Sequence, residues 1–259
     1  MGVLNVTPDS FYDGGKFMGE EKILAKAKRM LEEGATFIDI GGASSRPGSD
    51  PISLKEEIDR VIPTISTILK SFPKAVISID TTSSVVAEKA VESGASVVND
   101  ISAGTGDKRM LETVASLGVP YIAMHMQGTP KTMQNKPTYK DVVSDVFTSL
   151  ERFCNRAKQL GIEQLILDPG FGFGKTLSHN YQLLGQLDKF HILGYPLLVG
   201  VSRKSMIQKV VDVSAENALN GTTAIHTIAV QKGASILRVH DVKEAVQVFQ
   251  LVDYFNQQQ

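Results

Sequence analysis

The chain has 259 residues, of which 42% are hydrophobic, and a formal net charge of −1. This charge gives no basic surface for nucleic acid, and no run approaches the ~18 apolar residues that a membrane span needs. The single cysteine, Cys154, excludes internal disulfides and cysteine-cluster metal sites. The first residues carry neither a charged leader nor a long apolar segment, so we expect a cytoplasmic protein without a signal peptide.

Short apolar runs alternate with longer amphipathic segments along the whole chain. The pattern predicts strands at 1–4, 36–40, 75–79, 96–98, 121–124, 165–167, 196–199 and 235–237. It predicts helices at 20–33, 54–71, 85–93, 108–117, 141–160, 177–190, 206–211, 217–232 and 242–254. We expect Pro63 to kink or break the second of these helices.

The order of these elements predicts the fold class. Apolar strands that are each followed by a helix favour parallel pairing, and eight such units favour a closed (β/α)8 TIM barrel of the α/β class. A doubly wound open sheet is the alternative. No linker interrupts the pattern, so residues 1–259 are expected to form a single domain. Because the first strand begins at Met1, we expect a few residues that usually precede such a strand to be missing.

Polar side chains recur where the predicted strands end, at Asn5, Asp39, Asp80, Asn99, His125, Asp168, Ser202–Lys204 and Arg238–His240. In a barrel these positions converge on one rim, which is where such folds carry their sites. Each residue also has a structural alternative. Asp80 or Asp168 could cap the following helix, Asn99 could support a turn, and His125 is expected to be a satisfied core histidine. Arg238 could pair with a nearby carboxylate. Together, they favour a site for a polar heterocycle beside an anion.

The stretch from Leu165 to Thr176 reads LILDPGFGFGKT. Pro169 stands where a Walker phosphate loop requires glycine, so this is not a phosphate loop. The glycines allow the backbone to approach a ligand closely, and Phe171 and Phe173 are expected to offer aromatic faces. A second stretch, Ser202-Arg203-Lys204-Ser205, contains two cations and two hydroxyls. A Schiff base at Lys204 is conceivable, but this group favours recognition of an anion and a π face.

Eight stretches carry a resemblance to a known family: MGVLNVTPDSFYDGG, DIGGASSRPG, SIDT, VVNDIS, MHMQGTP, DPGFGFGKT, GVSRKS and RVHDV. In this order they resemble the dihydropteroate synthases of the folate pathway, and they cover the chain from end to end. The resemblance implies a TIM barrel that joins a dihydropterin methyl pyrophosphate to p-aminobenzoate and releases pyrophosphate. It also implies a homodimer, because the family usually pairs through its late helices.

The resemblance assigns roles residue by residue. The pterin set is Asp80, Asn99, Asp168 and Lys204, with Ile101 and Met124 packed on the ring. The pyrophosphate set is Asn5, Arg46, Arg238 and His240, with Mg²⁺ at Asn5. The p-aminobenzoate wall, where sulfonamides would compete, is Ser45, Pro47, Gly172, Phe173 and Ser205. Two loops rich in Gly, Pro, Asp and Ser, residues 7–17 (the first lid) and 43–50 (the second lid), are long enough to close over a ligand, and they contribute Asp9, Asp13 and Arg46. Asp39 also matches a family position, but its role is not evident.

The chain departs from the family in the second lid. Ala43 replaces a carboxylate and Ser45 replaces a threonine, so we expect a more loosely held lid and an altered affinity for drugs. Two other functions stay open. A related pterin-binding barrel that transfers a methyl group to a corrinoid should lack the first lid, the SRKS phrase and the basic RVH rim. A non-catalytic pterin-binding module would need neither Asn5 nor that rim.

Overall fold

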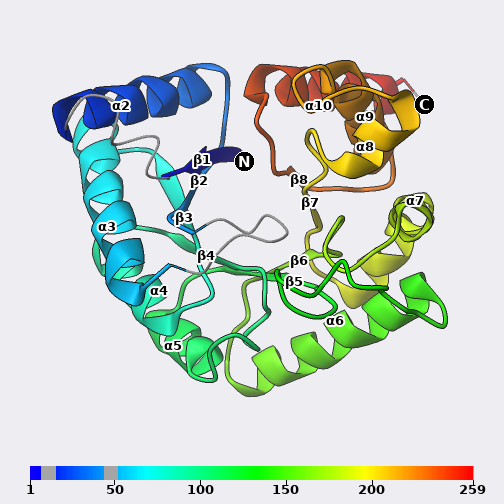
Figure 1. Ribbon diagram of the computed structural model, residues 1–259, viewed down its shortest axis with the longest axis horizontal. Helices are drawn as coiled ribbons and strands as arrows, with labels where there is room; N and C mark the ends of the chain where they lie inside the picture. Colours follow the sequence, from blue (N-terminus) through cyan, green and yellow to red (C-terminus); the bar gives the residue numbers. More distant parts are fainter. Residues whose placement is uncertain (7–15, 44–51, 259) are drawn as a thin grey trace.

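The computed structural model describes residues 1–6, 16–43 and 52–258 (Figure 1). Its strands are β1 (Gly2–Asn5), β2 (Phe37–Gly41), β3 (Val76–Asp80), β4 (Val97–Asp100), β5 (Tyr121–Met124), β6 (Leu165–Asp168), β7 (Leu198–Val199) and β8 (Ile236–Leu237). Its helices are α2 (Lys16–Glu32), α3 (Leu54–Ser71), α4 (Ser84–Glu92), α5 (Met110–Leu117), α6 (Val142–Gln159), α7 (Leu177–Gly185), the 3₁₀ helix η1 (Leu187–Leu193), α8 (Ser205–Val211), α9 (Leu219–Gln231) and α10 (Val242–Asn256). Each predicted strand is present within a few residues.

The strands form a closed ring. β1 to β6 pair in parallel in chain order, and β7 pairs in parallel with β8. Two isolated parallel bridges, Gly2 with Val239 and Leu167 with Leu197, join the two sheets on either side. The amide of Val3 donates to the carbonyl of Val239 over 2.9 Å, which ties the last unit to the first. The protein is therefore a (β/α)8 barrel, as predicted, and not an open sheet. The helices surround the strands in chain order (Figure 1).

Local capping explains where several helices begin. The side chains of Ser53, Ser83, Asp141 and Thr176 accept hydrogen bonds from the backbone amide three residues further on. These contacts satisfy amides that have no partner within the helix. Ser83 caps α4 and Thr176 caps α7, so Asp80 and Asp168 are not needed for that purpose and remain available at the strand ends.

Two helix predictions need correction. The predicted break at Pro63 is wrong, because α3 continues without interruption from Leu54 to Ser71. Pro63 is exposed, so the carbonyl that loses its hydrogen-bond partner there can turn to water. The predicted helix 177–190 instead ends at Gly185, and the chain continues as η1. Glycine is a poor helix former, which explains a change of helix type at this position.

The barrel interior divides into two layers, because alternate strand residues point inward. At the amino ends of the strands lies an apolar plug, made of Met1, Phe37, Val97, Ile122, Ile166, Leu198 and Ile236. Two residues further along the strands, Asp39, Asn99 and Arg238 make hydrogen bonds to one another across the interior. We call this end the polar mouth. In the described ranges, no helix is both long and apolar enough to cross a membrane.

Candidate active site

Asn5 and Asp80 flank a glycine on the strand between them. Asn5 pairs with Gly41 in the register of β1 and β2, and Gly41 pairs with Asp80 in that of β2 and β3. A Cβ built on Gly41 would lie 3.6 Å from Asn5 Oδ1 and 3.6 Å from Asp80 Oδ2. The absence of a side chain at Gly41 therefore leaves room between an amide oxygen and a carboxylate. Asp80 pairs in turn with Asn99 on β4, so three polar side chains follow one another around the mouth.

Arg238, which follows β8, crosses the mouth to two carboxylates. Its Nε donates to Asp39 Oδ2 over 2.7 Å, and its Nη2 donates to Asp80 Oδ2 over 2.7 Å. Asp39 Oδ2 also accepts from Asn99 Nδ2 over 3.1 Å. Asp39 is fully buried and Asn99 is 4% exposed, so these contacts are shielded from water. The resulting network fixes four side chains relative to one another, three from β2, β3 and β4 and one that follows β8.

Burial controls the charge of the two carboxylates at the mouth. It raises the pKa of Asp80 to about 7, against the opposing effect of Arg238. It also raises the pKa of Asp168, where the charge of Lys204 acts in the opposite direction. Removing a carboxylate from water disfavours its ionised form. A ligand that donates hydrogen bonds to these groups would compensate for the water they have lost.

Lys204 faces the site from the start of α8. Its Nζ donates to the carbonyl of Phe171 over 2.6 Å and lies 4.7 Å from the centre of the Phe173 ring. Burial lowers the pKa of Lys204 to about 8, and Asp168 opposes this shift. A Cβ built on Gly200 would lie 3.8 Å from Lys204 Nζ and 4.0 Å from Asp168 Oδ2. The ammonium and the carboxylate therefore both lie close to Gly200, where a side chain would contact them.

The loop after β6 is shaped by its own backbone. The amide of Gly170 donates to Asp168 Oδ1 over 2.7 Å, which orients the carboxylate. Gly170 has φ of 74°, and a Cβ there would lie 1.9 Å from the carbonyl oxygen of His125. Only glycine fits such a position. Phe171 is fully buried, so the expectation that both phenylalanines offer aromatic faces is wrong, and only the partly buried Phe173 remains for that role.

Sequence and structure comparisons agree with this geometry. The family model described as pterin binding enzyme matches residues 1–240. The dihydropteroate synthase of Haemophilus influenzae is 49% identical over 244 residues, which cover 93% of this chain and 88% of that protein. The chain belongs to the dihydropteroate synthase family. The Yersinia pestis dihydropteroate synthase, solved with a sulfonamide drug, superposes with a TM-score of 0.92 at 44% identity, covering 100% of this chain and 94% of that one. The Xanthomonas albilineans enzyme with 4-aminobenzoic acid gives 0.91 at 40% identity, covering 99% and 92%.

Five further residues expected from the family resemblance lie within the described part of the chain, at or near the mouth. Met124 ends β5 and is buried, with its Cγ 3.2 Å from the position of a Cβ on Gly170. Ile101 is partly buried after β4, Gly172 is partly buried after β6, and Ser205 is exposed as the first residue of α8. His240 is exposed, and its amide donates to Ser202 Oγ over 3.2 Å. Five expected residues lie outside the described residues: Asp9, Asp13, Ser45, Arg46 and Pro47.

The expectation that Arg203 and Lys204 form one cation pair for the dihydropteroate synthase site is wrong. Arg203 makes a bidentate pair with Asp241, through Nε over 2.7 Å and Nη2 over 2.9 Å. Its Nη1 donates to the carbonyls of Ala215 and Glu216 over 2.8 and 2.6 Å. Residues 201–204 form a turn, closed by the amide of Lys204 donating to the carbonyl of Val201 over 3.0 Å, with Arg203 at φ of 55°. The turn sends the two side chains in different directions, so only Lys204 reaches the mouth. Arg203 instead holds the loop before α9 against the start of α10.

Sequence reasoning missed the role of Lys175, which is only 3% exposed. Its Nζ donates to the carbonyls of Gly170 and Phe173 over 2.8 and 3.0 Å, and lies 3.0 Å from His125 Nδ1. Burial lowers the pKa of Lys175 to about 7 and that of His125 to about 3. His125 thus has a satisfied, structural environment. The signal for Lys175 was its place at the end of a glycine loop, whose bent backbone presents several unpaired carbonyls.

The donor groups of the mouth fit a Mg²⁺ ion held mainly by phosphate. The described residues contain no group of three or more His, Cys, Asp and Glu side chains that could hold a metal. Asn5 does offer an exposed amide oxygen beside Asp80. Mg²⁺ prefers hard oxygen ligands and is often bound through one or two protein groups plus substrate phosphates and water. One amide oxygen beside a pyrophosphate is therefore compatible with this ion.

Proposed function

We propose that the protein catalyses the dihydropteroate synthase reaction in its polar mouth. The pyrophosphate of 6-hydroxymethyl-7,8-dihydropterin is displaced by p-aminobenzoate, which gives 7,8-dihydropteroate and pyrophosphate. The observation that carries this proposal is the convergence of Asp80, Asn99 and Asp168 from three strands, beside Lys204, in a barrel of this family. Solved relatives that contain 4-aminobenzoic acid and 7,8-dihydropteroate support the same reaction.

The mouth matches the hydrogen-bonding groups of a pterin. The aminopyrimidine edge of the ring presents several N–H donors, and ionised Asp80 and Asp168 would accept hydrogen bonds from them. Asn99 supplies an amide oxygen, and Lys204 donates to a ring carbonyl or lies against the ring face. The partial burial of these groups strengthens each contact, because water competes less for them. Ile101 and Met124 would complete the slot with apolar surface.

The chemistry needs little from the protein beyond position and charge. As the bond between the pterin methylene and pyrophosphate breaks, the electron pair leaves with pyrophosphate, and the dihydropterin ring delocalises the resulting cation. The p-aminobenzoate nitrogen then forms the new carbon–nitrogen bond and loses a proton to solvent. An arylamine is already unprotonated at neutral pH, so the reaction requires no strong general base. Asn5, Arg46 and His240 would orient the pyrophosphate from the rim.

Magnesium would act on the same pyrophosphate. Asn5 would be the main protein ligand, and the bound ion would neutralise charge that develops on the leaving group. Ser45, Pro47, Gly172, Phe173 and Ser205 would form the wall for p-aminobenzoate. Sulfonamides would compete there, as the drug complex of the Yersinia pestis enzyme suggests. The change at Ser45 bears on drug affinity rather than on the reaction.

Pyrophosphate release, measured with and without p-aminobenzoate, tests the proposed reaction. We expect release from the dihydropterin pyrophosphate to be fast only when p-aminobenzoate is present, with formation of one dihydropteroate per pyrophosphate. Methyl transfer to a corrinoid without pyrophosphate release would favour the related barrel enzymes. Binding of the pterin with no product at all would favour a non-catalytic module. Either result would overturn the proposal.

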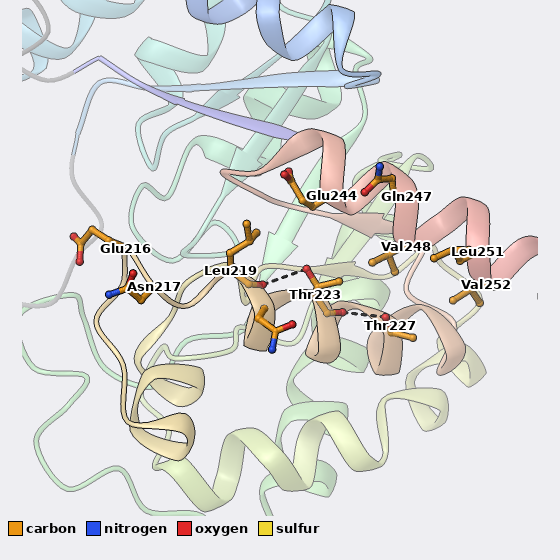
Figure 2. Close-up of a pocket in the computed structure, with 11 residues that line it drawn as sticks. Glu216, Asn217, Leu219, Thr223, Thr227, Glu244, Gln247, Val248, Leu251 and Val252 are labelled. Atoms are coloured by element: carbon orange, nitrogen blue, oxygen red, sulfur yellow. Dashed lines mark hydrogen bonds between the residues drawn. The ribbon is translucent and has the colours of Figure 1, made fainter.

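We also propose a homodimer through α9 and α10. A groove between these helices is lined by Thr223 and Thr227 on one side and by Val248 and Leu251 on the other (Figure 2). Leu251 is 72% exposed, and Tyr254 and Phe255 on the same helix are also exposed. An apolar surface of this kind is typical of an interface.

Light scattering tests this interface. Leu251→Glu should convert a dimer into a monomer, whereas Ile192→Glu on η1, which is also exposed, should leave the dimer intact. A monomeric wild-type protein would contradict the dimer. A Leu251→Glu variant that stays dimeric would place the interface elsewhere.

A further inference from the structure

Asp39 holds two site residues without being accessible itself. It lies on β2 in the interior of the barrel and is 0% exposed. Its Oδ2 accepts from Asn99 Nδ2 over 3.1 Å and from Arg238 Nε over 2.7 Å. Because no part of Asp39 reaches the surface, its side chain cannot contact a ligand directly. Its effect on a ligand must pass through these two neighbours.

The contact with Asp39 fixes the orientation of the Asn99 side-chain amide. An ionised carboxylate only accepts hydrogen bonds, so the contact with Asp39 requires the NH₂ group of Asn99, and not its carbonyl, to face β2. The carbonyl oxygen of Asn99 is then directed away from Asp39. If the amide rotated by half a turn, two oxygens would meet in a buried place, which is strongly unfavourable. Asp39 thus makes Asn99 present an acceptor to an N–H group of a ligand.

The second neighbour is shared between two carboxylates. Arg238 uses Nε for Asp39 and Nη2 for Asp80. A guanidinium can bind a single carboxylate through two parallel hydrogen bonds, which would occupy both of its oxygens. With Nε held by Asp39, the side-on fork of Nε and Nη2 is not available to Asp80, and Arg238 contacts Asp80 through Nη2 and the single oxygen Oδ2. The other oxygen, Oδ1, is thereby left for a ligand.

One oxygen of Asp39 lacks a partner. Oδ1 is buried and has no hydrogen-bond partner among residues 1–6, 16–43 and 52–258. A buried carboxylate oxygen without a partner is unfavourable in the folded state. The other oxygen makes both contacts, so the effect of the carboxylate falls on Asn99 and Arg238.

We propose that Asp39 is a positioning residue for pterin recognition, and that it fixes Asn99 as a hydrogen-bond acceptor and Arg238 as a single-oxygen partner of Asp80. This inference rests on the proposed function, because it assigns a further residue to the same site. Asp39→Asn should weaken binding of 6-hydroxymethylpterin by about 10- to 100-fold, the effect of losing a charge-assisted hydrogen bond. The KM for p-aminobenzoate should change little, because the contacts of Asp39 lie on the pterin side.

Ser78 provides a matched control. It pairs directly with Asp39 in the register of β2 and β3, is fully buried, and has an Oγ without a partner among the described residues. Ser78→Ala should therefore leave pterin binding unchanged. A purely structural role predicts a different result, namely equal losses of affinity per folded molecule for the pterin and for p-aminobenzoate.

A reciprocal exchange tests the proposed geometry. Asn99→Asp places two carboxylates side by side and should lower pterin affinity severely. Adding Asp39→Asn restores a donor–acceptor pair in the opposite direction, so the double variant should bind pterin at least about tenfold better than Asn99→Asp alone. The inference is overturned if Asp39→Asn binds pterin like the wild type, or if the double variant gains nothing. If the wild type neither binds pterin nor releases pyrophosphate, the proposed function fails instead.

Discussion

The two ends of the barrel interior are built from the same strands but have opposite compositions. At the amino ends, the apolar plug brings together side chains such as Ile122 and Leu198, which pack against the other apolar side chains of the plug. Two residues further along, Asp39, Asn99 and Arg238 form a buried polar network. The first arrangement is what folding favours. The second keeps charges away from water at a cost in stability, and this difference separates the part that maintains the fold from the part that binds a ligand.

The largest expected effect is on stability, at the plug. Ile122→Ala should lower the free energy of unfolding by about 2–5 kcal/mol, because it leaves a cavity in a fully buried position. Pterin affinity per folded molecule should stay within about twofold of the wild type. Urea unfolding combined with calorimetric titration checks both. A large loss of affinity in the folded fraction would show that the plug also shapes the site.

At the polar mouth, a substitution should lower pterin affinity and leave stability almost unchanged, which is the reverse of the effect at the plug. Asp168→Asn should cost about 1.5–3 kcal/mol in pterin binding, because a charge-assisted hydrogen bond is lost. The free energy of unfolding should change little or rise, since burial already raises the pKa of Asp168 and disfavours its charge in the folded state. The same two measurements apply. Normal pterin binding by this variant would remove Asp168 from the site.

Two basic residues of the rim, His240 and Arg238, should differ in which ligands they help to bind. His240→Ala should weaken binding of pyrophosphate by about 1 kcal/mol and spare a pterin that lacks phosphates, because its side chain is exposed at the rim. Arg238→Ala should weaken both ligands, since Arg238 also contacts Asp80. The family resemblance assigned both residues to phosphate, whereas the structural alternative for Arg238 was a pair with a nearby carboxylate. Competition titrations with pyrophosphate and with 6-hydroxymethylpterin measure the affinity of each variant for each ligand. If the two variants lost affinity for the two ligands in the same proportion, His240 and Arg238 would not have different roles.

The last expected effect, similar in size to that of His240→Ala, concerns pH. With its pKa raised to about 7, Asp80 is largely protonated below that pH and ionised above it. Only the ionised carboxylate accepts two hydrogen bonds, so pterin affinity should rise by up to about tenfold between pH 6 and pH 8. Arg238→Ala removes the cation that opposes this shift and should move the midpoint to higher pH. A flat profile for the wild type would show that Asp80 is ionised throughout.

Much of the fold could be predicted because its signals are local. Apolar runs and capping residues lie within a few positions of one another, so the eight strand–helix units were recognisable. Details that depend on exposure were not. The failure to foresee that α3 continues through Pro63 has this origin, because a helix tolerates proline where water can reach the freed carbonyl.

The place of a candidate residue was predictable where it ends a strand, as for Asp80 and Asp168. Its contacts were not predictable where partners are distant in sequence. Arg238 and Asp39 are separated by 199 positions, and no local pattern indicates that they pair. The same holds for Arg203, whose direction is set by Asp241. Lys175 was missed because a lysine is normally exposed, and only the bent loop reveals the carbonyls that bind it.

A crystal structure with 6-hydroxymethylpterin bound tests the central claim most directly, namely that the polar mouth is the pterin site. We expect the ring to lie in the mouth, with its N–H groups about 3 Å from the carboxylates of Asp80 and Asp168 and from the Asn99 oxygen. A ring bound elsewhere, such as in the groove between α9 and α10, would contradict the claim. So would a ring in the mouth with no contact to any of these three residues.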